Sequence, residues 1–194
     1  MQIIEWPQFL ENGFNHEKKF TSMTIGVFDG VHRGHRALID RIVSHNAGLM
    51  PVIITFRENH KTGKKGQITG DREQSDILTF QQRLAVFEEL GIQKTIVIDF
   101  TDEFKRMPGN DFFQVLLKHG RVRFFAVGSD FRCGYNLDMD ANAIKKHLAS
   151  YDIPAEIVQQ VTEGFLPISS SRIRCAIAAG DHSLAQAMLG YVLK

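Results

Sequence analysis

The most informative stretch of this sequence is Gly26-Val27-Phe28-Asp29-Gly30-Val31-His32-Arg33-Gly34-His35-Arg36-Ala37. It closes an apolar segment, forms a glycine-rich bend, and places two histidines three residues apart at the entrance of an amphipathic helix. A strand, a tight turn and a helix start bring free backbone N–H groups and the positive end of the helix dipole together. Gly30 and Gly34 allow the backbone to approach a ligand closely. His32 and His35 can add hydrogen bonds or positive charge, so the stretch predicts a phosphate site and nucleotide chemistry.

Other interpretations of this stretch fit less well. Gly26, Gly30 and Gly34 lack the spacing of the dinucleotide fingerprint, and a Walker loop would end in Gly-Lys-Ser or Gly-Lys-Thr. Histidines at positions i and i+3 could ligate zinc, but the stretch holds neither a cysteine nor a third histidine. A purely structural glycine turn remains an alternative, which the histidine pair at the helix entrance makes less attractive.

Length and composition indicate an ordinary globular protein. The 194 residues are expected to form a single domain, with 43% hydrophobic and 23% charged residues. A net charge of +1 argues against non-specific nucleic-acid binding. No apolar run has the length of a membrane span, and no basic segment followed by a hydrophobic stretch opens the chain. Cys133 and Cys175 are far apart, which favours reduced thiols and a cytoplasmic location.

Short β-rich runs alternate with helical patterns along the chain, which favours a Rossmann-like, doubly wound parallel α/β fold of about five strands. Strands are expected at residues 24–28, 52–56, 94–100, 122–127 and 155–161. Helices are expected at residues 35–45, 80–90, 112–120 and 141–150, with two short ones on either side of Gly180. The polar stretch from Arg57 to Asp76 shows no periodicity and is expected to be an active-site loop or a disordered insert.

Three segments follow predicted strands or precede a helix, at the expected ligand edge of such a sheet. They are residues 26–37, residues 127–134, and the run Ile168-Ser169-Ser170-Ser171-Arg172-Ile173-Arg174. Serines at a helix N-terminus beside arginines offer hydroxyl, N–H and guanidinium groups to phosphate oxygens. Each segment also has a simpler interpretation, since Ser170 or Ser171 could serve only as a helix cap.

Taken together, the three segments resemble the bacterial FAD synthetases. These form the adenylyltransferase half of the bifunctional riboflavin kinase/FMN adenylyltransferases and belong to the HxGH nucleotidyltransferases. The family pattern G-x-F-D-G-x-H-x-G-H is met in full from Gly26 to His35. The pattern G-x-N/D-F-x-F-G is met from Gly128 to Gly134, with Cys133 where phenylalanine is usual. The pattern I-S-S-T-x-I-R is met from Ile168 to Arg174, with Ser171 in place of threonine.

This resemblance implies that AMP is transferred from ATP to FMN, giving FAD and pyrophosphate, with Mg²⁺ and without a covalent intermediate. It implies catalytic roles for His32, His35 and Arg174. The residues it implies for ATP binding are Gly26, Phe28, Asp29, Gly30, Gly34, Gly128, Ser170 and Ser171. Those implied for flavin binding are Phe56, Asn59, His60, Asp130 and Phe131. His32 and Arg174 are expected to face a cleft. The metal ligands stay open, as does the oligomeric state, for which a monomer is the default.

Two departures from the family pattern affect these expectations. The chain stops at Lys194, so we expect no riboflavin kinase domain and no kinase activity. The family's T-F-x-P-H-P is replaced by Thr55-Phe56-Arg57-Glu58-Asn59-His60, in which both prolines are missing and the histidine is displaced by one position. Because this segment lies near the flavin end of the site in the family, two alternatives stay open. The chain could transfer a nucleotide to another phosphorylated acceptor, or bind ATP or flavin without catalysis.

Overall fold

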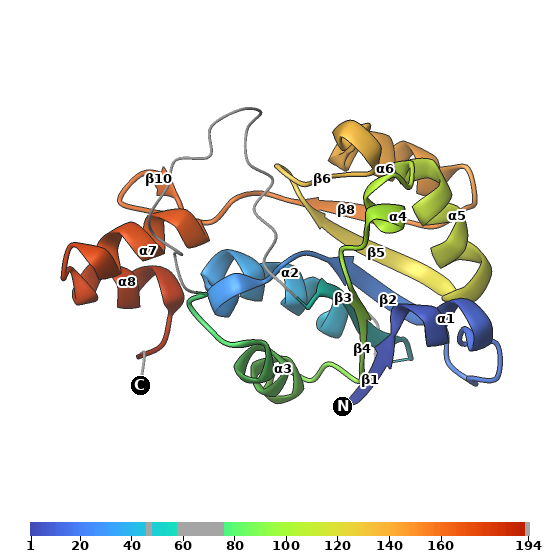
Figure 1. Cartoon of the computed structure of the whole chain (residues 1–194), viewed down its shortest axis with the longest axis horizontal. Coiled ribbons are helices and arrows are strands. Elements are labelled where there is room, and N and C mark those ends of the chain that lie inside the picture. Colours follow the sequence, from blue (N-terminus) through green and yellow to red (C-terminus); the bar gives the residue numbers. More distant parts are fainter. Residues whose placement is uncertain (46–47, 58–75, 193–194) are drawn as a thin grey trace.

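The computed structural model describes residues 1–45, 48–57 and 76–192. Its centre is a six-stranded parallel sheet with the order β1-β4-β3-β2-β5-β8 (Figure 1). The strands are β1 (Gln2–Glu5), β2 (Thr21–Ile25), β3 (Met50–Phe56), β4 (Lys94–Ile98), β5 (Val122–Gly128) and β8 (Ala155–Val158). The predicted fold class is therefore confirmed.

The expected number of about five strands is too low by one, because β1 was missed. This edge strand has only two apolar residues, so its sequence does not predict a strand. It forms a strand because it pairs with β4. The strand expected at residues 24–28 is also displaced. It runs from Thr21 to Ile25, since Phe28 takes a left-handed backbone conformation with φ 58° that no strand can contain.

The strand order changes direction beside β2. From β2 the chain moves outward through β3 to β4, and it then returns to the other side of β2 to form β5 and β8. In an open parallel sheet, the crevice outside the carboxyl ends of the strands at such a switch point is where ligands bind. The topology thus places the site between the ends of β2 and β5.

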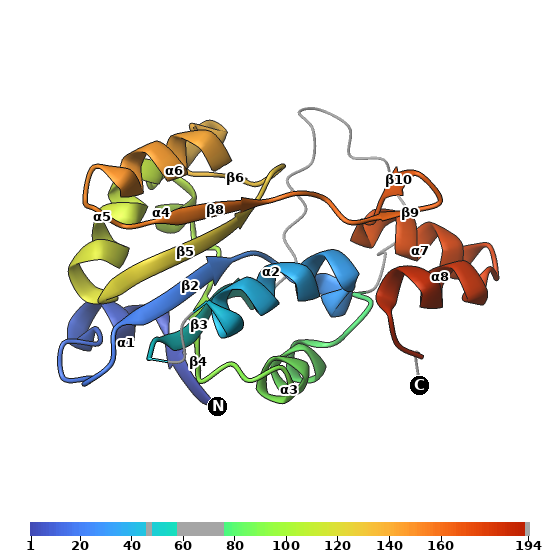
Figure 2. The same cartoon turned by 180° about the vertical axis from the view of Figure 1, so that it is seen from behind.

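Helices cover both faces of the sheet (Figures 1 and 2). Val52 and Ile54 of β3 belong to a core with α1 (Trp6–Asn12), α5 (Gly109–His119) and α6 (Ala141–Ala149), whereas Ile53 packs with α2 (Arg33–Ser44) and α3 (Phe80–Glu89). This follows from the alternation of side chains along a strand. A short helix, α4 (Asp102–Lys105), precedes α5. None of the described helices is long and apolar enough to span a membrane.

The C-terminal elements lie beyond the carboxyl ends of the strands, toward which the arrows of β2 and β5 point in Figure 2. They are the hairpin β9 (Thr162–Glu163) and β10 (Leu166–Pro167), and the helices α7 (Ser170–Ala178) and α8 (His182–Leu189). They share a small core of their own. Arg33 joins them to α2 through an ion pair with Glu163 and a hydrogen bond to the carbonyl of Ala187.

A second short hairpin follows β5 and was not expected from the sequence. It consists of β6 (Arg132–Cys133) and β7 (Met139–Asp140), with the 3₁₀ turn η2 (Tyr135–Leu137) between them. Asp138 accepts a hydrogen bond from the backbone N–H of Gly109 at 3.0 Å, which joins this hairpin to the start of α5. Gly134 has φ 82°, and a Cβ there would lie 1.9 Å from Asp138 Oδ1 and 2.3 Å from Gly109 N. Only glycine fits at this junction.

We expect Gly134→Ala to reduce the free energy of unfolding by about 2–4 kcal/mol, because it adds a steric clash to the cost of a positive φ. Gly180→Ala is the matched control, since Gly180 has φ 75° but nothing within 4 Å of the position of a Cβ. Its cost should be only about 1 kcal/mol. Urea unfolding of both variants measures the difference, and equal losses would contradict the close approach at Gly134.

Candidate functional site

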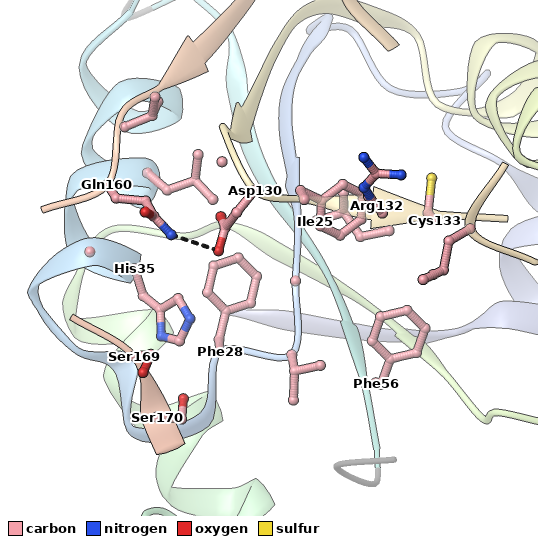
Figure 3. A pocket seen from close by; sticks show the side chains of 18 of the residues that line it. Ile25, Phe28, His35, Phe56, Asp130, Arg132, Cys133, Gln160, Ser169 and Ser170 are labelled. Atoms are coloured by element: carbon pink, nitrogen blue, oxygen red, sulfur yellow. Dashed lines mark hydrogen bonds between the residues drawn. The ribbon is translucent and has the colours of Figure 1, made fainter. Parts of the chain in front are cut away.

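A cavity of about 470 Å³ lies at the carboxyl ends of the strands, beside the switch point. All three segments singled out in the sequence contribute to its wall, as Figure 3 shows for Phe28, Asp130 and Ser170. The predicted site residues on this wall are Gly26, Phe28, His32, Gly34, His35, Phe56, Gly128, Asp130, Phe131 and Ser170. Its volume lies in the range of small-molecule sites.

The turn between β2 and α2 places the two histidines. Phe28 has φ 58° and ψ 29°, and a one-turn 3₁₀ helix, η1 (Asp29–Val31), leads to His32 at the N-terminus of α2. The ring of Phe28 is fully buried against His35 and Phe87, which holds this rare conformation in place. His32 Nδ1 accepts a hydrogen bond from the backbone N–H of His35 at 3.3 Å. His32 is therefore the N-cap of α2, although histidine is not a usual cap.

The two imidazoles are stacked, with ring centroids 3.6 Å apart and an angle of 16° between the planes. Burial lowers the pKa of His32 to about 4, against a smaller opposing effect of Asp130. Burial, aided by the charges of His32 and Arg83, holds the pKa of His35 well below 6.5. Both rings are thus neutral near pH 7 in the free protein. Within the described residues, His35 Nδ1 has no hydrogen-bond partner.

The glycines of the turn make room for the protein's own rings. A Cβ at Gly26 would lie 3.2 Å from the ring of Phe28, and a Cβ at Gly34 would lie 3.2 Å from the ring of His32. Both distances are tighter than ordinary van der Waals contact. These two glycines therefore allow the aromatic packing that positions the histidines, in addition to keeping the backbone open toward the cavity.

Asp29 connects the turn to two distant parts of the chain. Its carboxylate accepts a hydrogen bond from the N–H of Ile77 at 2.9 Å and forms an ion pair with Arg174. The side chains of this pair are 3% and 10% exposed. In addition, Ser170 Oγ donates to the carbonyl of Asp29 at 2.9 Å. Asp29 thus holds the start of α7 against the turn.

Of the predicted site residues that the structure describes, four are not on the wall of this cavity: Asp29, Gly30, Ser171 and Arg174. The expectation that Arg174 faces a cleft changes accordingly, since its guanidinium is committed to Asp29 and lies 3.5 Å from Ser171 Oγ. The sequence could not indicate this pairing, because the partners are 145 residues apart. Asn59 and His60 lie outside the described residues.

The end of the cavity away from the histidines is lined by phenylalanines, most of which the sequence did not indicate as site residues. Besides the predicted Phe56 and Phe131, its wall contains Phe100, Phe104 and Phe112. The rings of Phe56, Phe100 and Phe104 contact one another with centroids 5.5–6.1 Å apart. Figure 3 shows Phe56 and Cys133 at this end, away from His35, Ser169 and Ser170. The abundance of phenylalanine was the available signal, and it does not separate core from cavity.

Most of the uncharged polar side chains of the cavity lie at the histidine end, whereas Figure 3 shows Arg132 beside Cys133. Asp130 accepts a hydrogen bond from Gln160 Nε2 at 2.9 Å (Figure 3). Lys105 and Arg132 add two cations to the remaining wall. Among the described residues, no group of three histidine, cysteine, aspartate or glutamate side chains could hold a metal ion. The arrangement suits an anion at one end and a flat apolar group at the other.

This geometry agrees with the comparison to known proteins. A model of the FAD synthetase family matches residues 14–172. The chain therefore belongs to the FAD synthetase family.

Two relatives have names that include two enzyme activities. The chain is 31% identical over 171 residues to the bifunctional riboflavin kinase/FMN adenylyltransferase of Escherichia coli strain K12, covering 87% of this chain and 54% of that protein. It is 29% identical over 181 residues to the protein of the same name from Bacillus subtilis strain 168, covering 90% of this chain and 54% of that protein. The chain thus spans about half the length of these relatives.

A solved structure supports the fold alone. The crystal structure described as a macrolide-efflux protein from Streptococcus pneumoniae superimposes with a TM-score of 0.82 at 24% sequence identity. The match covers 98% of this chain and 60% of that one.

The lowered pKa of His32 predicts a loss of stability in acid. Between pH 6.5 and about 4, the unfolded state binds more protons at this residue than the folded state, so stability falls as the pH falls. From pH 7 to pH 5 this contribution is about 2 kcal/mol. The variant His32→Asn keeps a capping acceptor, but its side chain does not titrate. Between pH 7 and pH 5 its free energy of unfolding should therefore fall by about 2 kcal/mol less than that of wild type. Urea unfolding at both pH values tests this, and identical pH dependence would contradict it.

The buried pair of Asp29 and Arg174 predicts strong coupling. Arg174→Met should cost about 3–5 kcal/mol of stability, because it leaves a buried carboxylate without its partner. The same substitution in an Asp29→Asn background should cost much less, since no charge remains to be compensated. A double-mutant cycle by chemical denaturation measures the coupling, and additive effects would show that the pair is not formed.

Proposed function

We propose that this chain transfers AMP from ATP to FMN, giving FAD and pyrophosphate. The observation that carries the proposal is the joining, in one cavity, of a polar end at a helix N-terminus with an aromatic end. Membership of the FAD synthetase family supports it independently. The names of the E. coli and B. subtilis relatives include this activity.

The polar end suits the triphosphate of ATP. The N-terminus of α2 and the imidazoles of His32 and His35 supply hydrogen-bond donors toward an anion. Negative charge beside these rings would raise both pKa values, so phosphate binding would favour their protonation. Ser169 and Ser170 stand on the cavity wall at the start of α7. The Ser170 hydroxyl already donates to the carbonyl of Asp29, whereas Ser169 Oγ accepts from the N–H of Arg172 and keeps its own hydrogen for the same phosphates. In this proposal Arg174 acts through Asp29, whose charge it balances, and so positions Ser170.

The aromatic end suits the isoalloxazine ring of FMN. A flat ring system gains from stacking and edge-to-face contacts with the phenylalanines, beyond the gain from burying apolar area. Phe56 at the end of β3 and Phe131 after β5 belong to this part of the wall. The FMN phosphate would then extend toward the histidines.

The reaction would be a direct displacement. An oxygen of the FMN phosphate attacks the α-phosphorus of ATP, a new P–O bond forms, and the bond to the β-phosphate bridging oxygen breaks. Pyrophosphate leaves with that electron pair, so no nucleophile from the protein is needed. Acceleration would come from alignment of the two substrates and from donors placed where charge develops.

Magnesium enters the proposal as the counter-ion of ATP. The described cavity wall has one carboxylate, Asp130, and no cluster of metal-binding side chains lies among the described residues. This donor set does not fit a resident metal held mainly by protein ligands. A Mg²⁺ ion that keeps several waters and binds phosphate oxygens suits such a wall.

Product analysis after incubation with FMN, ATP and Mg²⁺ tests the proposal. Equal amounts of FAD and pyrophosphate are expected, and His32→Ala should reduce the rate on the order of a hundredfold through the loss of a donor. Near-ultraviolet circular dichroism should show that this variant stays folded. Absence of FAD would overturn the proposal. If ATP still bound, transfer to another phosphorylated acceptor and non-catalytic binding would be separated by assaying pyrophosphate with other acceptors.

A further inference from the structure

Arg83 of α3 is a buried cation that the sequence did not single out. Its residue is 1% exposed, yet it lies next to the carboxyl ends of β2 and β3. One terminal nitrogen donates to the carbonyl of Val27 at 2.5 Å and to Thr55 Oγ1 at 3.4 Å. The other donates to the carbonyls of Phe56 at 3.2 Å and Arg57 at 2.9 Å. Its guanidinium also lies over the ring of Phe80, 5.2 Å from the centroid.

These carbonyls belong to the two sides of the cavity. Val27 directly precedes Phe28 of the histidine turn, whereas Phe56 has its ring in the aromatic end. A planar guanidinium can hold carbonyls on both sides at once, because its donors form a rigid fork. Burying this cation is costly unless such hydrogen bonds compensate it. The bonds therefore fix the end of β3 relative to the turn.

We propose that Arg83 is a positioning residue that sets the aromatic, acceptor side of the cavity relative to the nucleotide side. The inference rests on the proposed function. The turn has other anchors, since Asp29 binds Ile77 and Arg174, and Tyr191 donates to the carbonyl of Gly30 at 2.6 Å. Three of the four hydrogen bonds of Arg83 go to residues 55–57. Loss of the fork should thus displace mainly the acceptor side.

The test compares Arg83→Lys with wild type in steady-state kinetics. A lysine keeps the charge but has one nitrogen in place of the two terminal nitrogens of the fork, so it cannot hold the carbonyls of Val27, Phe56 and Arg57 at once. KM for FMN should therefore rise about tenfold, while KM for ATP changes less than threefold. Lys94→Met is the matched control. Lys94 is the first residue of β4 and so lies at the amino-terminal ends of the strands, away from the cavity. It is 8% exposed and forms an ion pair with Glu17. Its loss should lower stability and leave both KM values unchanged. Equal rises in both KM values in Arg83→Lys would overturn the inference.

Hydrogen exchange gives a readout that does not depend on the reaction. In Arg83→Lys the amide of Arg57, which donates to the carbonyl of Ile98 at 3.1 Å, should exchange at least tenfold faster than in wild type. The amide of Val31 in the turn should change less than threefold, and Lys94→Met should alter neither. If the Arg57 amide exchanged at the same rate in Arg83→Lys as in wild type, the positioning role of Arg83 would be overturned even if FAD forms. Fast exchange without FAD from the wild type would overturn the proposed function and retain the placement by Arg83.

Discussion

The site depends on one buried carboxylate, that of Asp29. It lies in a turn whose preceding residue, Phe28, has a left-handed backbone, and it is almost inaccessible to water. A buried carboxylate is tolerated only where hydrogen bonds and a countercharge replace its hydration. Ile77 supplies the hydrogen bond and Arg174 supplies the charge. Meeting this requirement brings the segment before α3 and the helix α7 against the turn, which closes one side of the cavity.

Much of this arrangement could be predicted because its causes are local. The glycine-rich turn and the histidine at the entrance of α2 each depend on a few neighbouring residues. A serine cap of α7 was also expected, but it is Ser169, whose Oγ accepts from the N–H of Arg172, and not Ser170 or Ser171. Parallel α/β topology then brings strand ends to one edge, so the convergence of residues 26–37, 127–134 and 168–174 followed from the pattern of elements. The three segments do share one cavity.

The remaining features could not be predicted because they depend on contacts between residues far apart in the sequence. Arg174 resembles a phosphate ligand in its motif, and only its proximity to Asp29 reveals a role as a counter-ion. Arg83 occupies an ordinary position in an amphipathic helix, and its four acceptors lie 26 to 56 residues away. The edge strand β1 likewise owes its order to β4. Sequence patterns report what a residue can do, whereas the fold determines which partner it meets.

The balance of charges in the described site explains how this site can form in the protein without a bound ligand. Burial lowers the pKa of both stacked imidazoles, and the charges of His32 and Arg83 lower the pKa of His35 further. Arg174 is balanced by Asp29, and Arg83 is surrounded by carbonyls. The folded chain therefore holds donors in place without accumulating uncompensated positive charge. Under the proposed function, the phosphates bring the negative charge that makes protonation of the histidines favourable, so the positive charge would develop only when its partner is present.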